Sequence, residues 1–245
     1  MIKRVSLGEL VAEYIGSMFL VMAAISSMIL FTSVFESAKG IAVLANAFAV
    51  AFVLCALIEM FGGVSGAHFN PVVTLVMAFE KKDGALKAVV FMLFQIAGGI
   101  TGTIISRLMF LDEVGSILAV SDTVRSDYVY IGEVVGTFVL VLAILMLGKM
   151  KSSKISIIVG FLVGGQLLST SSTMFANPQV TIARMFTNTA AGIRPTDGLI
   201  FIIMQIIGAL LAYAVYKLVF SKNDYRVEED NVLRERMCLS KNKLS

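Results

Sequence analysis

Residues 70–75 read Asn70-Pro71-Val72-Val73-Thr74-Leu75, and residues 177–182 read Asn177-Pro178-Gln179-Val180-Thr181-Ile182. An Asn side chain accepts a backbone N–H at the start of a helix, and a Pro at the first helical position has no N–H to leave unpaired. Each copy opens an apolar segment, 69–79 and 176–187, that is shorter than the roughly 20 residues a bilayer span needs. The pair therefore predicts two half-helices that enter a membrane without crossing it.

Six other apolar runs are long enough to cross a bilayer. The chain is 58% hydrophobic and only 15% charged, with a mean hydropathy of +0.89, whereas about a quarter of the residues of a soluble domain are charged. We therefore predict an all-α membrane protein with six transmembrane helices and two re-entrant half-helices. The expected spans are 7–32, 41–62, 86–109, 129–149, 154–174 and 198–220.

The chain also repeats itself outside the two Asn-Pro segments. The residues that follow Glu13 resemble those that follow Glu133, and the surroundings of Gln95 resemble those of Gln205. Because each half holds three spans, the second half must be inserted upside down relative to the first. Such inverted repeats place their functional site near the membrane midplane, where broken helices meet. We expect a single transmembrane domain over 1–221, with repeat one at 5–110, repeat two at 126–221 and a charged cytoplasmic tail at 222–245.

The distribution of Lys and Arg predicts the orientation. The short loops on one side carry four basic clusters, and this side is expected to face the cytoplasm together with both chain ends. The net charge of +3 is small and does not indicate a nucleic-acid partner. The expected location is the plasma membrane, crossed several times. The clusters are Lys3 and Arg4; Lys81, Lys82 and Lys87; Lys149, Lys151 and Lys154; and Lys217 and Lys222.

Few residues offer metal, redox or catalytic chemistry. Cys55 lies in an apolar run, Cys238 lies in the tail, and His68 is the only histidine. These residues lack the spacing of a metal site or a disulfide framework. No nucleophile triad or nucleotide-binding motif is present. We therefore expect no cofactor, no metal and no enzymatic activity.

The two half-helices predict a pore. Non-helical backbone at membrane depth requires protein or a water-filled cavity around it. If the half-helices enter from opposite faces, their positive ends meet at the centre and disfavour cations there. With their side-chain oxygens held by the caps, Asn70 and Asn177 would offer amide hydrogens to a passing solute. The predicted central lining comprises Asn70, Pro71, Val72, Asn177, Pro178 and Gln179.

With this repeat, the stretch Ser65-Gly66-Ala67-His68-Phe69-Asn70-Pro71 and the second Asn177-Pro178, the chain resembles the aquaporin and aquaglyceroporin (major intrinsic protein) family up to about residue 221. The resemblance implies an hourglass of six helices and two half-helices, usually a homotetramer with one pore per subunit, in a lipid bilayer. It implies a small neutral permeant such as water or a glycerol-like polyol. His68 would lie beside the cytoplasmic mouth, either in the wall or in a packing role.

The sequence departs from that family at the outer selectivity filter. Most members carry Arg three residues after the second Asn, where this chain has Val180. Carried over by spacing, the other filter positions are Val50, Gly165 and Met174. These residues predict a wide apolar constriction that suits glycerol-sized solutes. A branch with the same Val is associated with arsenic resistance and with neutral metalloid acids such as arsenous acid.

Arg184 complicates this filter because it lies four residues after Val180, on the same helix face. Its guanidinium is expected about one turn, roughly 5.4 Å, further out. One hypothesis is that Arg184 replaces the missing filter charge as a cation guard at the outer mouth. The alternative is that it snorkels or pairs with a nearby carboxylate.

Two carboxylates lie inside predicted spans at repeat-equivalent positions, Glu13 and Glu133. Charged groups at such depth are costly and usually functional. We expect each to accept backbone N–H groups of a re-entrant loop, rather than to relay protons. Gln95 and Gln205 are expected to hold loop carbonyls.

Two other functions fit an inverted repeat or a membrane location. A coupled secondary transporter would need charged coupling sites at the midplane, and the segments beside Asn70 and Asn177 contain none. A non-conducting membrane scaffold protein would need a binding motif in the outer loop or tail, where none is recognisable. A passive channel is the function that the sequence favours.

Overall fold

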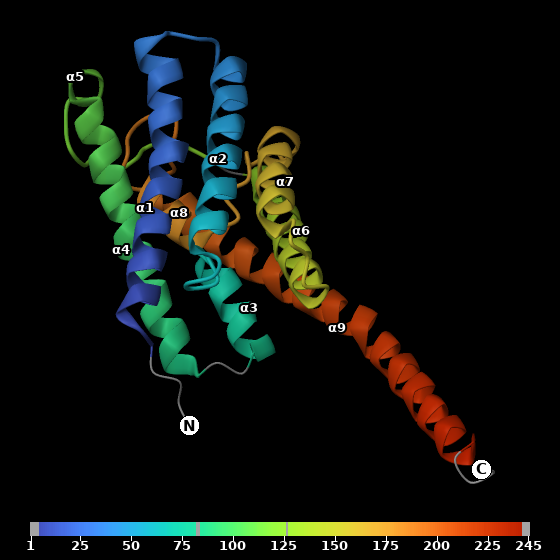
Figure 1. Cartoon of the computed structure of the whole chain (residues 1–245). Helices are drawn as coiled ribbons and strands as arrows, with labels where there is room; N and C mark the ends of the chain where they lie inside the picture. The colour runs from blue at the N-terminus through green and yellow to red at the C-terminus, as the bar shows by residue number, and fades with distance from the viewer. Residues whose placement is uncertain (1–4, 82–83, 126, 242–245) are drawn as a thin grey trace.

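The computed structural model describes the backbone of residues 5–81, 84–125 and 127–241, and side chains as far as Phe220 apart from that of Lys81. All regular structure in these residues is helical (Figure 1). The helices are α1 (Leu7–Ile29), a π-helical turn (Leu30–Val34), α2 (Lys39–Phe61), α3 (Pro71–Lys81), α4 (Ala85–Met109), α5 (Leu111–Val114), α6 (Val129–Lys149), α7 (Ile155–Ser169), α8 (Pro178–Arg184) and α9 (Pro195–Lys241).

Five helices of the described residues are long and apolar enough to cross a membrane, namely α1 with its π-turn, α2, α4, α6 and the first part of α9. The expected span at 154–174 is the exception, because α7 ends at Ser169 after 15 residues. Thr170 is extended, and Thr173 and Met174 have positive φ angles of 55° and 34°. The apolar run therefore continues into a buried loop, which hydropathy alone does not distinguish from helix.

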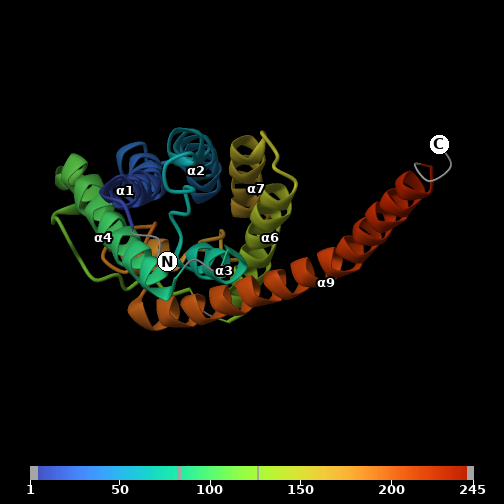
Figure 2. The ribbon, with the colours of Figure 1, turned by 60° about the horizontal axis from the view of Figure 1, so that its bottom comes forward.

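The last helix is longer than the sequence predicted. The expected span ended near residue 220, yet α9 continues as one helix to Lys241. At 1.5 Å per residue, its 47 residues extend about 70 Å. The described part of the predicted tail is thus a helical extension that leaves the bundle, as Figures 1 and 2 show. The start of α1 and the end of α9 lie on the same side of the bundle in Figure 1.

The helices pair in the same way in both repeats. α1 packs against α4 in the first repeat, α6 packs against α9 in the second, and α2 packs against α7 between them. Two equivalent glycines permit close crossings in these pairs. A Cβ on Gly98 would overlap the Tyr14 carbonyl, and a Cβ on Gly208 would overlap the Val134 carbonyl. Small residues allow such backbone approach between membrane helices.

The two half-helices begin where the Asn-Pro motifs predicted, at Pro71 and Pro178. Both contact α4 and α9, and they contact each other. Their extents differ from the expected 69–79 and 176–187, since each Asn caps its helix from outside. α8 stops at Arg184 because the chain turns back there, with the Ile193 N–H donating to the Arg184 carbonyl.

Candidate functional site: the cavity at the meeting of the half-helices

The two asparagines cap their own half-helices and brace the opposite one. Asn70 Oδ1 accepts the Val72 N–H, and Asn177 Oδ1 accepts the Gln179 N–H, both at 3.1 Å. Asn70 Nδ2 donates to the Ala176 carbonyl and Asn177 Nδ2 to the Phe69 carbonyl, both at 2.8 Å. A primary amide has two N–H groups, so each side chain keeps one donor beyond this brace.

The residue before each asparagine has an unusual backbone. Phe69 and Ala176 both have φ of 46°, a left-handed conformation that costs energy in residues with a side chain. Each is held from two sides. Its N–H donates to the glutamate of its own repeat, and its carbonyl accepts from the asparagine of the other repeat. These paired bonds offset the strain and fix where the two caps meet.

The two glutamates are fully buried and lie behind the re-entrant loops. Glu13 accepts the backbone N–H groups of His68 and Phe69 at 3.0 and 2.7 Å, and it accepts the Ser65 hydroxyl at 2.6 Å. Glu133 accepts the backbone N–H groups of Phe175 and Ala176, both at 2.8 Å. Each carboxylate is therefore compensated by several donors, as a buried charge requires.

Gln95 and Gln205 have hydrogen-bond partners other than those expected. Instead of holding loop carbonyls, Gln95 Nε2 donates to Glu13 and Thr74, and Gln205 Nε2 donates to Glu133 and Thr181. The reason is that each glutamate has acceptor capacity left after binding the loop N–H groups. Each glutamine therefore links the carboxylate to its half-helix.

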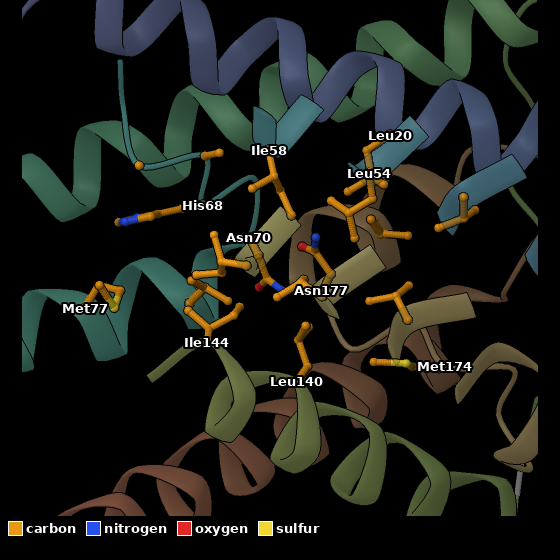
Figure 3. A pocket seen from close by; sticks show the side chains of 18 of the residues that line it. Leu20, Leu54, Ile58, His68, Asn70, Met77, Leu140, Ile144, Met174 and Asn177 are labelled. Atoms are coloured by element: carbon orange, nitrogen blue, oxygen red, sulfur yellow. The ribbon is translucent and has the colours of Figure 1, made fainter. Parts of the chain in front are cut away.

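The asparagines share a cavity of about 380 Å³ that passes through the centre of the bundle. In Figure 3, Asn70 and Asn177 lie together at its middle, with His68 and Met77 toward one end and Met174 toward the other. Apart from these polar groups the wall is mainly aliphatic. It includes Leu20, Leu54, Ile58, Leu140, Ile144 and Val159.

Three of the four predicted filter residues line this cavity: Val50, Met174 and Val180. Gly165 does not, because it lies on the exposed side of α7, where an added Cβ would meet no atom within 4 Å. Val163 and Leu167 line the cavity instead. Two residues along a helix turn the side chain by about 200°, so α7 presents these two residues and turns Gly165 outward.

Four predicted central residues lie behind the lining rather than in it. Pro71, Val72, Pro178 and Gln179 are buried but are not among the described residues that line the cavity. Val72 packs with Ala209 and Tyr216. Gln179 Nε2 donates to the Phe69 carbonyl at 3.2 Å, while its Oε1 fills the space that a Cβ on Gly99 would occupy.

Arg184 reaches the same cavity from one turn beyond Val180. Its side chain is 3% exposed, its Nε donates to the Ala191 carbonyl, and its guanidinium carbon lies 3.7 Å from the centre of the Phe175 ring. No carboxylate forms an ion pair with it among the described residues. This end of the cavity is therefore not purely apolar, because Arg184 also lines it.

Beyond Arg184 lies a second cavity, of about 580 Å³. Asn46 and Arg184 line both cavities, so the two meet at these residues. Asn46 was not singled out from the sequence, although a buried amide inside an apolar span is a visible signal. Its Nδ2 donates to the Ala24 carbonyl and to Ser27 Oγ, both at 2.8 Å.

Arg125, in the loop before α6, was likewise missed because its acidic neighbours dominate that loop. Its Nε donates to the Gly192 carbonyl at 2.9 Å, and its Nη groups donate to the Ser172 and Ala190 carbonyls. Burial lowers the pKa of Arg125 to about 10, so it stays charged at neutral pH. It joins the outer loop to the chain on both sides of α8, the second half-helix.

The opposite end of the central cavity is more polar. His68 Nδ1 lies 3.1 Å from Thr74 Oγ1, and its ring packs edge-on against Phe91. Glu80 and Lys149 also line this end. In the part of the chain with described side chains, no group of three or more His, Cys, Asp or Glu residues could hold a metal ion.

The profile of the family described as Major intrinsic protein matches residues 1–176, which is more than half of the chain. The match ends one residue before Asn177. Among known proteins, Aquaglyceroporin AqpS of Rhizobium meliloti (strain 1021) is 35% identical over 212 residues, covering 84% of this chain and 88% of that protein.

Two further comparisons agree with this similarity. The Glycerol uptake facilitator protein of Bacillus subtilis (strain 168) is 36% identical over 114 residues, 42% of each chain. The X-ray structure of the aquaglyceroporin from Plasmodium falciparum aligns with a TM-score of 0.63 at 18% identity, covering 87% of this chain and 96% of that one. At that level of identity the structural likeness concerns the fold.

Proposed function

The chain belongs to the major intrinsic protein family, and from this premise we propose that it is a passive transmembrane channel for small uncharged solutes, above all glycerol-like polyols and water. The observation that carries the proposal is the single cavity that contains both asparagines and continues from the Glu80 end to Arg184. At the middle of this cavity a solute meets two amide donors in a mainly aliphatic wall. The names of the glycerol-transporting relative and of the aquaglyceroporins support the choice of permeant.

The central step is orientation of the permeant. A water or hydroxyl oxygen between Asn70 and Asn177 accepts the N–H that each amide keeps beyond its brace. Its own hydrogens then point away from the centre in both directions, which interrupts a chain of hydrogen bonds that would carry protons. The positive ends of α3 and α8 add an electrostatic barrier against cations. Arg184 strengthens that barrier at the outer mouth.

Size selection takes place where Val50, Met174 and Val180 line the cavity. Val is smaller than the Arg usual at position 180, so solutes with a carbon skeleton find room there. Neutral metalloid acids such as arsenous acid are similar in size to glycerol-like solutes, and the proposal includes them as permeants. His68 forms part of the wall at the opposite mouth.

We further propose the cellular setting. The protein assembles as a homotetramer with one cavity per subunit, in the plasma membrane, with both chain ends in the cytoplasm. Support comes from the basic clusters in the short loops and from the apolar side chains that face outward. The latter include Phe48, Phe52, Leu93, Phe161 and Leu210.

Stopped-flow light scattering on proteoliposomes tests this function. We expect water, glycerol and arsenous acid to enter the proteoliposomes faster than they enter protein-free liposomes. This entry should need no ion gradient across the membrane. Val180→Arg should reduce glycerol and arsenous acid entry by about tenfold or more and water entry much less, because a long cationic side chain narrows the passage. Rates equal to those of protein-free liposomes would refute the channel, and equal fluxes in the variant would remove Val180 from the constriction.

A further inference from the structure

The outer cavity has an unbalanced charge. The described residues that line it include Lys39 from the start of α2, Arg125 from the outer loop and Arg184 from α8, and they include no Asp or Glu. Two acidic groups beside these arginines are already engaged. Asp197 accepts from Arg194 and from the Arg125 backbone, while Glu133 accepts three N–H donors behind the loop. A cavity lined by one sign of charge attracts the opposite sign.

Arg184 provides directed donors within this field. Although 97% of the side chain is removed from solvent, only Nε donates to another described residue, the Ala191 carbonyl. Both Nη groups make no hydrogen bond with the described residues, and Arg184 lies at the junction of the two cavities. Its flat face is covered by Phe175. The edge of the guanidinium remains, and this edge matches two oxygens of a carboxylate or phosphate.

The neighbouring groups complete the site. Arg125 uses its donors to hold three carbonyls, so it contributes charge more than hydrogen bonds. Lys39 is exposed and can move, so its ammonium can approach a third oxygen. Hydroxyl groups line the same cavity from Thr32, Ser37, Thr123, Ser171 and Thr173.

We propose that Arg184, Arg125 and Lys39 form a binding site for a small oxyanion such as inorganic phosphate. A bound oxyanion on the Nη edge of Arg184 lies in the passage between the outer and central cavities, and it slows the entry of neutral solutes. The site thus makes the conductance depend on the anions present outside. The part about entry rests on the proposed channel function, whereas the binding site itself does not.

Equilibrium dialysis of the purified full-length protein in detergent with radiolabelled inorganic phosphate tests the binding. We expect saturable binding that weakens by about tenfold in Arg184→Gln, the effect of losing a charge-assisted pair. Arg125→Gln and Lys39→Gln should weaken it severalfold. Lys39 is exposed at the helix start, so this variant stays informative if an arginine variant fails to fold. Lys151→Gln is the matched control, because it removes the same charge from an exposed position outside both cavities.

Glycerol entry into proteoliposomes tests the occlusion. Glycerol entry is measured with phosphate on both sides of the membrane and, as the reference, with chloride at the same ionic strength. Phosphate should slow glycerol entry through the wild-type and Lys151→Gln proteins, and it should slow entry through Lys39→Gln less. The site would be overturned if phosphate did not bind saturably, or if the three site variants bound phosphate as well as Lys151→Gln does. This conclusion would hold whether or not the protein conducts glycerol. Binding without any effect on a measurable glycerol flux would overturn the occlusion.

Discussion

Gln179 is the residue where the two half-helix motifs differ most in chemistry. At the corresponding place in the first motif stands Val72, which packs against Ala209 of α9. Gln179 instead faces Gly99 of α4 and adds a second donor to the Phe69 carbonyl. Its Oε1 is buried and lacks a hydrogen-bond partner among the described residues. The larger side chain on α8 is thus matched by the absence of a side chain on α4.

This match predicts a compensating pair of substitutions. Gly99→Ala should lower the free energy of unfolding by about 1–3 kcal/mol, because the new methyl overlaps Gln179 Oε1. Gly99→Ala combined with Gln179→Ala should recover most of the loss. Thermal unfolding in detergent, followed by the helical circular dichroism signal because the chain has no Trp, measures both.

Gly40→Ala is the matched control, since its Cβ would meet no atom within 4 Å. We expect this change to stay within about 0.5 kcal/mol of wild type. A double variant as unstable as Gly99→Ala alone would mean that another neighbour of Gly99 causes the loss.

Each half-helix is an element that depends on a long helix for its position. α3 is held by Glu13 of α1, and α8 is held by Glu133 of α6. The half-helices are short, with 11 and seven residues, and helices of this length are not stable by themselves. Their place at the centre is therefore set by hydrogen bonds from neighbouring elements more than by helix propensity.

Glu13→Gln should therefore displace the first re-entrant loop. The amide has one acceptor oxygen where the carboxylate had two, so the N–H groups of His68 and Phe69 and the Ser65 hydroxyl compete for it. Hydrogen bonds to a charged group are worth about 1.5–3 kcal/mol each. We expect the free energy of unfolding, measured by thermal unfolding, to fall by at least the value of one such bond. Glycerol flux should fall together with stability.

The control for this change is Glu9→Gln, at the start of the same helix. Glu9 pairs with Lys87 near the surface, where an ion pair contributes about 0–1 kcal/mol. If Glu13→Gln were no more harmful than Glu9→Gln, the buried carboxylate would not be what holds the loop.

At the scale of the whole molecule, two similar halves form one conduit, while the C-terminal extension lies apart from it. The described cavity lining runs from Leu20 to Tyr216 and draws on both repeats. The extension of α9 beyond Phe220 leaves the bundle (Figure 2). Conduction and the extension therefore belong to different parts of the chain.

Removal of residues 225–245 should accordingly leave the channel intact. We expect water and glycerol permeabilities per inserted protein within about twofold of the full chain, a tolerance expected for a terminal segment outside the packed core. Stopped-flow measurements normalised to the amount of inserted protein check this. A several-fold change in either direction would assign the extension a role in conduction.

The sequence by itself determined where the half-helices start, five of the six long spans and which carboxylates hold the re-entrant loops. These features follow from local chemistry: a side chain that caps, a proline without an N–H, the length of an apolar run, and a charge too costly to leave unpaired. The same reasoning identified Asn70 and Asn177, whereas Val50, Met174 and Val180 were carried over by spacing from the resembled family. The cavity brings all five together.

Only the tertiary structure decided which face each element turns to the cavity. Val163 and Leu167 replace Gly165 because the rotation of α7 about its axis depends on its packing against α2. The early end of α7 depends on residues with positive φ that the loop needs to reach α8. Arg125 enters the site from a distant loop. Such placements arise from contacts between segments far apart in the chain, and local sequence does not encode them.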